Sequence, residues 1–327
     1  MSEFANGASW IPAFAGMTFG GLQVTKKQRN RISGWIAVVK AHGMSSTQAV
    51  GKIRWLFNAE KAGHGGTLDP LASGLLPIAL GEATKTVQWA MDGRKTYRFT
   101  AAWGAETNTD DLEGEITRRS EKRPTQAEIE ALLPRFTGTI LQAPPAFSAI
   151  KIDGERAYDL ARAGEVLEMA EREVHIESLK ILETTEDKAI FETICGKGTY
   201  IRSLARDLGR SLGCFAHVST LRRTQVGGLS EPQMISLEKL EEMGIGGAIE
   251  ALKGALLPLE TVLDGIPALA VLDNDAAKLR QGQKVLLRGA NAPISEAAVL
   301  VRHGTELVGI GEVSQGSLKI KRLFNLL

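Results

Sequence analysis

This chain of 327 residues has little of what most often indicates a function. It has only two cysteines, Cys195 and Cys214, which form no Cys-x-x-Cys pair, so we expect reduced, buried thiols rather than a disulfide. Its five histidines are scattered without the spacing of metal ligands, so we predict no metal site. The net charge of +1 gives no global field that would indicate a nucleic-acid partner.

Long hydrophobic runs are missing as well. No apolar run approaches the roughly 18 residues of a membrane helix, so we predict no membrane association. The apolar stretch 10–17 follows no basic region and contains Pro12 and Gly16, which makes it a poor signal peptide. Residues 1–31 lack periodicity, and we predict a poorly ordered N-terminal extension. Its basic end, residues 26–31, is either a solvated linker or an RNA contact.

Three common catalytic signatures are absent. The chain has no Gly-x-Ser-x-Gly elbow of a serine hydrolase and no Gly-x-x-x-x-Gly-Lys-Ser/Thr loop for a nucleotide phosphate. The glycines of 63–66 do not follow the dinucleotide fingerprint, because Pro70 breaks any helix that would begin there. These absences argue against the commonest hydrolase, kinase and dehydrogenase chemistries for this chain.

What the chain does have is an unusual loop, residues 63–77, with the sequence GHGGTLDPLASGLLP. Its glycines let the backbone approach a ligand closely, and Pro70 restrains Asp69 before it. Loops on rigid scaffolds are where catalytic groups concentrate. Aspartate and proline are also turn formers, so from the loop alone a purely structural turn remains an equal interpretation.

The rest of the pattern predicts an α+β fold, because strands and helices mix without regular βαβ alternation. Tyr97 lies on an alternating strand, where it shares a face with Phe99. An acidic, turn-rich loop is expected at 105–115. Beyond a linker near 254–267, short strands separated by glycine turns predict a small β-barrel or sandwich. Strands are predicted at 34–40, 95–103, 148–153, 174–182, 189–194, 215–226, 285–287, 298–302, 307–313 and 318–320, and residues 75–80 form an apolar run. Helices are predicted from a cap at Ser45 or Ser46 to Gly63, at 84–91, 125–136 and 156–163, and after Thr199.

Asp69 needs cationic support if it acts as a nucleophile. Such an aspartate must be ionised near neutral pH, and a nearby arginine stabilises the charged form. Thr199 can cap a helix with a leucine stripe, which puts Arg202 near the helix start. From spacing alone, Arg202 is either a partner of Asp69 or a solvated helix arginine.

Seven blocks of the sequence resemble the bacterial tRNA pseudouridine-55 synthases. They occur in the order of that family and span about residues 34–226. The blocks are Gly63–Pro77, Gly81–Lys85, Lys95–Tyr97, Thr109–Glu115, Pro144–Lys151, Gly198–Gly209 and Leu221–Thr224.

The resemblance implies a pseudouridine synthase fold in residues 32–264, with a central, largely antiparallel mixed sheet flanked by helices and loops. It implies a small β-rich, PUA-like RNA-binding domain in residues 265–327. The implied activity is a cytoplasmic isomerase that converts uridine 55 in the T loop of tRNA to pseudouridine. The reaction changes neither redox state nor atom count, so no cofactor is expected. The implied partner is tRNA alone, contacted at the T loop and stem and on the acceptor side, by a monomer without an obligate protein partner. Basic residues for the acceptor side are Lys319, Lys321 and Arg322.

The resemblance also implies roles for individual residues. Asp69 aligns with the catalytic aspartate, which attacks the ribose at C1′ or the uracil at C6. Tyr97 aligns with a tyrosine that stacks on the target base, and Arg202 with the arginine that pairs with the aspartate. His64 aligns with a histidine that helps flip the base out of the loop. The remaining matches, to pocket positions or an apolar residue near the base, are Lys40, Tyr200 and Leu221.

Two departures from the family pattern affect a loop that supports the pocket. Ala41 stands where the family usually has proline, and Ser45 where threonine is usual. Two other functions are conceivable: an RNA-binding module that has lost catalysis, and a synthase that depends on a guide RNA. Retention of Asp69, Tyr97 and Arg202 favours the enzyme, because a pure binder has no need of them.

Overall fold

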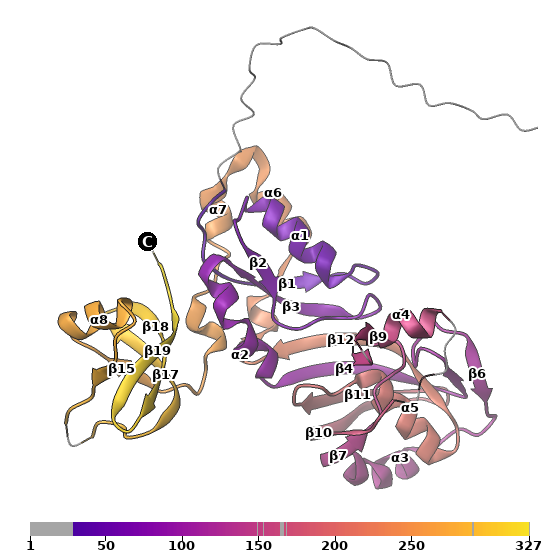
Figure 1. Ribbon diagram of the computed structural model, residues 1–327. Helices are drawn as coiled ribbons and strands as arrows, with labels where there is room; N and C mark the ends of the chain where they lie inside the picture. The colour runs from indigo at the N-terminus through magenta and orange to yellow at the C-terminus, as the bar shows by residue number, and fades with distance from the viewer. Residues whose placement is uncertain are drawn as a thin grey trace, which may run out of the picture.

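The computed structural model describes residues 29–148, 150–152, 154–163, 167, 169–289 and 291–326 (Figure 1). Of the predicted N-terminal extension only residues 29–31 are described, and residues 1–28 lie outside the described part. Asp153, the end of one predicted strand, also lies outside it. Asn30 is placed by a backbone hydrogen bond from its N–H to the Asn58 oxygen at 2.8 Å. The chain forms a large mixed sheet with helices, followed by a smaller β domain at the C-terminus (Figure 1).

The large sheet has ten strands in the order β14-β1-β3-β12-β4-β11-β10-β7, with β2 on β3 and β13 on β12. Among the described strands of this sheet, the β1–β14 and β3–β12 pairings are parallel and the others antiparallel. This confirms the predicted α+β class with a largely antiparallel mixed sheet. The bounds are β1 Gly34–Lys40, β2 Ala62–His64, β3 Ser73–Leu80, β4 Lys95–Trp103, β7 Gly138–Gln142, β10 Arg172–Thr184, β11 Lys188–Cys195, β12 Ala216–Val226, β13 Leu229–Ser230 and β14 Ile235–Ser236.

The β3–β12 junction matters most for the site because it joins the two halves of the sheet. Gly74 pairs with Arg223 there, at φ +96, and a Cβ on Gly74 would lie 2.2 Å from the Arg223 oxygen. Only glycine allows this close backbone approach at a positive φ. The loop that precedes β3, with Asp69, is thereby brought next to β12 and its neighbour β4.

Two helix boundaries differ from the prediction. Helix α1 (Ser46–Leu56) is capped by Ser45, one of the two predicted caps, which forms a capping box with Gln48. The helix ends at Leu56, and Gly63 lies in β2. Helix α5 (Ile201–Leu212) has Tyr200 rather than Thr199 as its N-cap, with no side-chain cap. In α5 the predicted leucine stripe, Leu204, Leu208 and Leu212, is buried.

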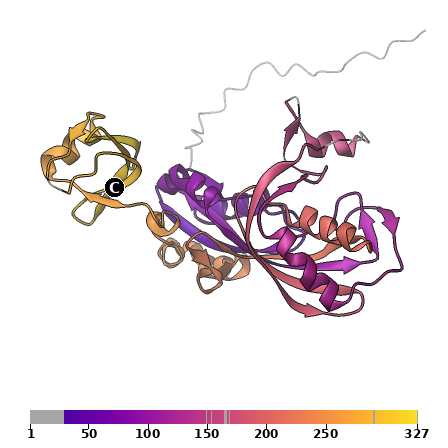
Figure 2. The same ribbon diagram turned by 90° about the horizontal axis from the view of Figure 1, so that it is seen from below.

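Several predicted elements are shorter or divided. The predicted strand 148–153 is reduced to β8 (Lys151–Ile152), paired with β9 (Glu155–Arg156), and this hairpin with α4 (Ala157–Arg162) projects from the sheet (Figure 2). The expected loop 105–115 starts as strand β5 (Ala105–Thr107), paired with β6 (Ile116–Arg119). The remaining elements of the large body are η1 Gly81–Thr86, α2 Val87–Asp92, α3 Gln126–Leu132, η2 Leu133–Phe136, η3 Glu231–Gln233, α6 Leu237–Met243, η4 Ile245–Gly247, α7 Ile249–Lys253 and η5 Leu259–Val262.

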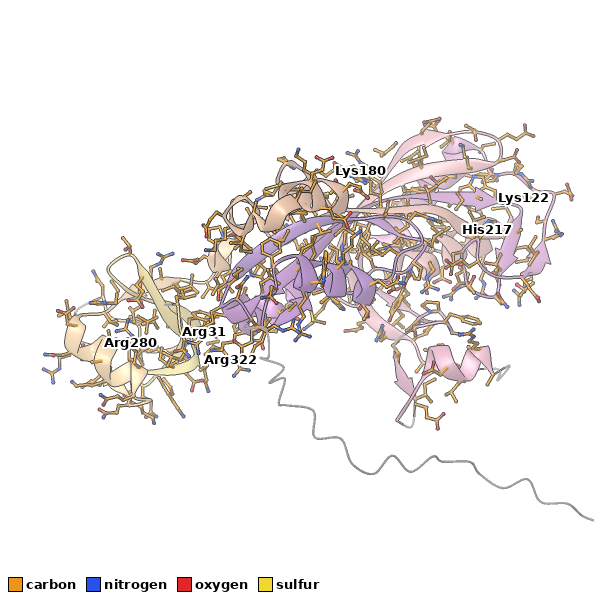
Figure 3. The ribbon with its side chains drawn as sticks, turned by 90° about the horizontal axis from the view of Figure 1, so that it is seen from above. Arg31, Lys122, Lys180, His217, Arg280 and Arg322 are labelled. Atoms are coloured by element: carbon orange, nitrogen blue, oxygen red, sulfur yellow. The ribbon has the colours of Figure 1, made fainter. Side chains whose placement is uncertain are left out.

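The C-terminal domain is a curled sheet of five strands in the order β15-β17-β18-β19-β16. The predicted β-rich character is therefore confirmed, whereas α8 (Asp273–Arg280) was not predicted. Leu300 and Phe324 belong to the same buried cluster as Trp35 and Val226 of the large body. Figure 3 places Arg280 and Arg322 on this domain and Lys122 at the far end of the molecule. The strands are β15 Ala268–Ala270, β16 Val285–Leu286, β17 Glu296–His303, β18 Glu306–Ser314 and β19 Ser317–Leu323.

Both cysteines are free and buried, as predicted. Burial raises the pKa of the Cys195 thiol to about 11, so this thiol stays protonated and unreactive at neutral pH. Among the described helices, none has both the length and the apolar character needed to cross a membrane.

Candidate active site

Lys40, at the end of β1, supports the loop that carries Asp69. Its side chain is fully buried, and Nζ donates to the backbone oxygens of Ala41 at 2.9 Å, Met44 at 2.7 Å and Pro70 at 3.3 Å. Burial lowers the pKa of Lys40 to about 8, against the opposing effect of the Asp69 charge. The structure therefore places this predicted pocket residue under the loop, where it holds the residue next to Asp69.

Arg223 supports the same loop from β12. This side chain is 1% exposed, and its guanidinium donates to the backbone oxygens of Leu75 at 2.8 Å, Gly66 at 3.0 Å and Thr67 at 3.4 Å. The sequence had placed Arg223 in a family-like block without giving it a role. A signal was available, because Arg223 alternates with Leu221 on one face of a predicted strand.

Arg202 meets Asp69 directly. Its Nε donates to Asp69 Oδ2 at 2.9 Å, and its other two nitrogens donate to the backbone oxygens of Thr109 at 2.9 Å and Phe147 at 3.0 Å. The Asp111 carboxylate lies 3.5 Å away. The Arg202 side chain is 5% exposed and that of Asp69 36%, so a buried cation holds a carboxylate that still reaches solvent. Arg202 is thus not a solvated helix residue.

A cavity of about 590 Å³ opens beside this pair. Five of the seven predicted site residues line it, which brings together positions from β4, α5, β12 and the Asp69 loop. Lys40 and His64 are not among its lining residues. The predicted residues that line it are Asp69, Tyr97, Tyr200, Arg202 and Leu221, and those not predicted include Lys95, Ser148, Arg172, Lys197 and Arg223.

Tyr97 and Leu221 form part of the cavity wall from neighbouring strands. Tyr97 pairs with Arg223 and Leu221 with Phe99 in the β4–β12 register. Burial raises the pKa of the Tyr97 phenol, and the Arg223 charge opposes this only in part, so the phenol is protonated at neutral pH. The wall therefore offers a flat ring with a hydroxyl next to an apolar side chain, which suits a planar base.

Tyr200 is held in place at both its backbone and its ring. Gln142 donates to the Tyr200 oxygen at 3.1 Å and accepts from the Tyr200 N–H at 2.8 Å. The Arg172 guanidinium lies 5.3 Å from the centre of the Tyr200 ring, a cation–π distance. Within the described residues, Arg172 Nε and Ser148 Oγ are buried without a hydrogen-bond partner, so this end of the cavity has polar groups available for a ligand.

His64 lies on β2, where it pairs with Ile78 of β3. Burial lowers the pKa of His64, and so does the charge of Arg223, which favours the neutral imidazole. Its Nδ1 is buried without a partner in the described structure. His64 is half-buried at the start of the Asp69 loop and does not line the cavity.

Other candidate sites carry less chemistry. A larger groove of about 1310 Å³ lies beside the exposed side chains of Trp55 and Ile245, and none of the predicted site residues lines it. Among the described residues, no group of three or more histidine, cysteine, aspartate or glutamate side chains could hold a metal ion. The Asp69 cavity therefore remains the candidate active site.

Three family models match consecutive parts of this chain. Residues 54–201 match "TruB family pseudouridylate synthase (N terminal domain)". Residues 202–264 match "tRNA pseudouridylate synthase B C-terminal domain", and residues 267–324 match "Pseudouridine synthase II TruB, C-terminal". The matches cover both the large body and the small β domain.

Curated relatives agree over nearly the whole length. The tRNA pseudouridine synthase B of Bradyrhizobium diazoefficiens is 56% identical over 309 residues, which cover 94% of this chain and 89% of that protein. The protein of the same name from a Chelativorans species is 52% identical over 307 residues, covering 92% and 98%.

Solved structures show the same fold at lower identity. A chain of a Cbf5-Nop10-Gar1 complex superimposes with a TM-score of 0.70 at 26% identity, over 89% of this chain and 85% of that one. A chain of an H/ACA RNP bound to a substrate RNA containing 2′-deoxyuridine gives a TM-score of 0.68 at 25% identity, over 90% and 85%.

Proposed function

This chain belongs to the TruB family of pseudouridylate synthases and is an isomerase that makes pseudouridine in tRNA, and we propose that it acts on uridine 55 of the T loop with Asp69 as the nucleophile. The observation that carries the proposal is the Asp69–Arg202 pair at 2.9 Å on the wall of a cavity large enough for a nucleotide. A carboxylate held by a buried cation, with one face open to a ligand, is suited to nucleophilic attack.

The proposed reaction conserves all atoms. Asp69 attacks C1′ of the ribose and the N-glycosidic bond breaks, or it attacks C6 of the ring first. The uracil turns over in the cavity and its C5 bonds to C1′. In the first route this bond displaces the Asp69 carboxylate from C1′, and in the second Asp69 leaves C6 when C5 loses its proton. The proton on C5 is lost and one is gained at N1, so neither an oxidant nor a cofactor is consumed. The protonated Tyr97 phenol and its ring support a role in stacking on the base and relaying this proton.

The target base must leave the T loop to reach Asp69, which costs a few kcal/mol. We assign to His64 the task of helping to flip the base, since it stands at the start of the Asp69 loop with a free ring nitrogen. We assign to Tyr200 and Leu221 the packing of the flipped base, since both line the cavity. Lys40 acts by holding the Pro70 oxygen beside Asp69.

We also propose that the protein acts on tRNA as a cytoplasmic monomer, without a guide RNA or an obligate protein partner. Identities of 56% and 52% to proteins named tRNA pseudouridine synthase B support this reading over a guide-dependent synthase. The identity to the chain from the Cbf5-Nop10-Gar1 complex is only 26%. The basic residues of the small domain support contact with the acceptor side, and such phosphate contacts make binding salt-dependent. These residues are Lys319, Lys321 and Arg322.

The direct test incubates the purified protein with an unmodified tRNA transcript and no other RNA. Carbodiimide treatment followed by primer extension should give a stop that reports pseudouridine at position 55. A transcript with cytidine at that position is the control and should give none. A stop only at another uridine would contradict the assigned target, and a stop that requires added guide RNA would contradict independent action.

A further inference from the structure

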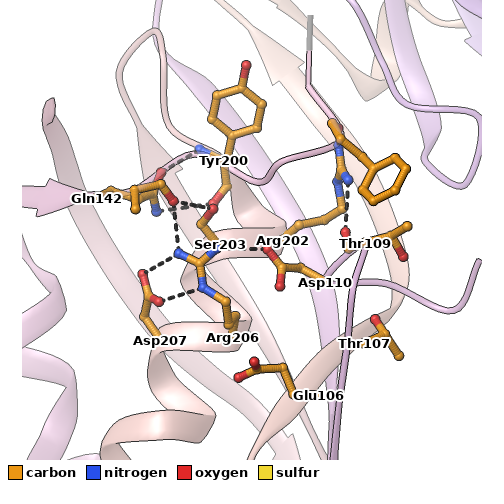
Figure 4. Close-up of polar contacts among 12 residues, drawn as sticks. Glu106, Thr107, Thr109, Asp110, Gln142, Tyr200, Arg202, Ser203, Arg206 and Asp207 are labelled. Carbon is orange, nitrogen blue, oxygen red and sulfur yellow. Dashed lines mark hydrogen bonds and ion pairs between the residues drawn. The ribbon is translucent and has the colours of Figure 1, made fainter. Parts of the chain in front are cut away.

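Helix α5 presents two buried arginines one turn apart, and only the first touches Asp69. Arg202 is 5% and Arg206 7% exposed, and the i, i+4 spacing puts them on one face (Figure 4). Arg206 Nη1 donates to Asp110 Oδ2 at 2.9 Å, and both side chains are buried, with exposed fractions of 8% for Arg206 and 7% for Asp110. A buried ion pair is weak evidence for stability, because desolvation offsets much of the attraction, so its purpose is to be sought elsewhere.

The two arginines bind the same two chain segments. Arg202 donates to the backbone oxygens of Thr109 and Phe147. Arg206 donates to the Asp110 carboxylate, next to Thr109, and to the Ala143 oxygen at 2.8 Å, in the segment that leads to Phe147. The acceptors that orient the Arg202 guanidinium therefore lie in segments that Arg206 ties to the same helix.

The backbone of Asp110 adopts a conformation that most side chains avoid. Asp110 adopts φ +60, the left-handed region, where glycine fits without strain and other residues are held only by their surroundings. Its carbonyl accepts from the Val218 N–H at 3.0 Å, which fixes the peptide to β12. The ion pair with Arg206 is the side-chain contact that holds Asp110 in this conformation (Figure 4).

We propose that the Asp110–Arg206 pair is a positioning device for catalysis: it holds the Thr109 and Phe147 carbonyls so that the Arg202 guanidinium keeps its edge toward Asp69. The inference rests on the proposed role of Asp69 and deepens it. Neither Asp110 nor Arg206 lines the cavity, and Arg202 is the arginine of α5 that bonds to Asp69, so the pair acts through Arg202.

Asp110 also provides a readout that a merely structural pair would lack. Burial raises the pKa of Asp110 to about 6, and the neighbouring Arg206, Arg202 and Arg210 oppose this while Glu106 adds to it. Protonation near pH 6 removes the charge on which the pair depends. The single-turnover rate of the wild type should therefore fall as pH decreases through about 6, with unchanged affinity for tRNA.

The test compares Arg206→Lys and Asp110→Asn with the wild type in single-turnover reactions at saturating tRNA. We expect each rate to fall about 10- to 100-fold with the dissociation constant for tRNA within about twofold, because a small misplacement of catalytic groups costs rate rather than binding. The double variant should be no slower than the slower single variant, since each single variant already removes the Asp110–Arg206 pair. In Asp110→Asn the acid limb near pH 6 should be absent.

The matched control is Arg210→Lys, one turn further along α5. Arg210 pairs with Glu106 at 2.7 Å and contacts neither segment through a hydrogen bond, so its variant should keep the wild-type rate within about twofold. A wild-type rate in Arg206→Lys, or an equal loss in Arg210→Lys, would overturn the positioning role. If Asp110→Asn does not fold, the wild-type profile decides, and a flat rate between pH 5 and 7 would overturn it. A wild type that forms no pseudouridine instead refutes the proposed function.

Discussion

Asp69→Asn should separate catalysis from stability. Asparagine keeps the shape of the side chain and an oxygen that can accept from Arg202 Nε, now 2.9 Å from Asp69 Oδ2. It lacks the negative charge and the nucleophilicity of the carboxylate, so pseudouridine formation should fall by at least about 10³-fold. Binding of tRNA should be retained, because neither the cavity walls nor the basic surface changes.

The effect on stability follows from burial. The Asp69 side chain is 36% exposed, and loss of a partly exposed ion pair costs at most about 1 kcal/mol. Arg202 keeps its two backbone acceptors and lies 3.5 Å from Asp111, so its charge remains compensated. Arg202→Met should behave differently. It leaves the 4% exposed Asp111 carboxylate without its cation, and breaking a buried pair costs about 3–5 kcal/mol.

The assay combines primer-extension stops, filter binding of tRNA and thermal unfolding on the two variants. Asp69→Asn should lose the stop, bind tRNA like the wild type and unfold within a few degrees of it. Arg202→Met should lose the stop and also unfold well below the wild type. Full activity of Asp69→Asn would refute the nucleophile, and a larger loss of stability in Asp69→Asn than in Arg202→Met would refute the electrostatic reasoning.

Three further expectations concern the support of the site and the binding of tRNA. The pKa of Lys40 is lowered from 10.5 to about 8, so between these pH values the folded state binds fewer protons than the unfolded state, and the free energy of unfolding should rise with pH. Denaturant titrations at pH 8 and 10 should show a smaller rise for Lys40→Met than for the wild type. An equal rise in the two proteins would contradict a buried ammonium at Lys40. Gly74→Ala should destabilise the fold strongly, because the new Cβ would lie 2.2 Å from the Arg223 oxygen. Gly51→Ala on α1, where a Cβ would meet no atom within 4 Å, should instead raise stability by up to about 1 kcal/mol. Equal melting temperatures of the two variants would refute the close approach at Gly74. Glutamine at Lys319, Lys321 and Arg322 of the small domain should weaken tRNA binding and lower the slope of log affinity against log salt by about 1 per lost phosphate contact. The single-turnover rate at saturating tRNA should be unchanged. An unaltered salt slope would show that these residues do not contact tRNA.

Local signals in the sequence predicted most elements of the fold. Alternation and apolar runs identified β1 and β4 with their observed bounds, and Ser45 identified the start of α1. The errors have tertiary causes. Tyr200 rather than Thr199 caps α5, because Gln142 of β7 binds both the N–H and the carbonyl of Tyr200. The end of α1 was missed because Asn58, at φ +45, takes a left-handed conformation soon after it, where the prediction looked for glycine.

The candidate site was predictable only where a residue stands in a recognisable block. Asp69 and Arg202 are far apart in sequence, and spacing alone did not decide whether Arg202 is a partner of Asp69 or a solvated helix arginine. The resemblance to the family predicted the pairing, which the structure shows at 2.9 Å. Arg172 and Ser148 line the same cavity. Ser148 stands in the block Pro144–Lys151, but no role was predicted for it, and Arg172 lies outside every block. Their place on the cavity wall depends on how β10 and the segment before β8 pack, which no local pattern encodes.

Buried side chains determine the shape of the glycine-rich Asp69 loop. Lys40 binds the Pro70 oxygen, Ser46 Oγ both donates to and accepts from the Leu68 backbone, and Arg223 binds the Gly66 and Leu75 oxygens. These contacts come from β1, α1 and β12, so the loop is anchored to three elements before any substrate arrives. A group held in this way loses little freedom at the moment of reaction, which is where positioned catalysts gain rate. The glycines therefore serve close packing, as Gly65 shows with a Cβ position 2.7 Å from the Ala90 side chain, and the rigidity of Asp69 derives from the cations that surround its loop.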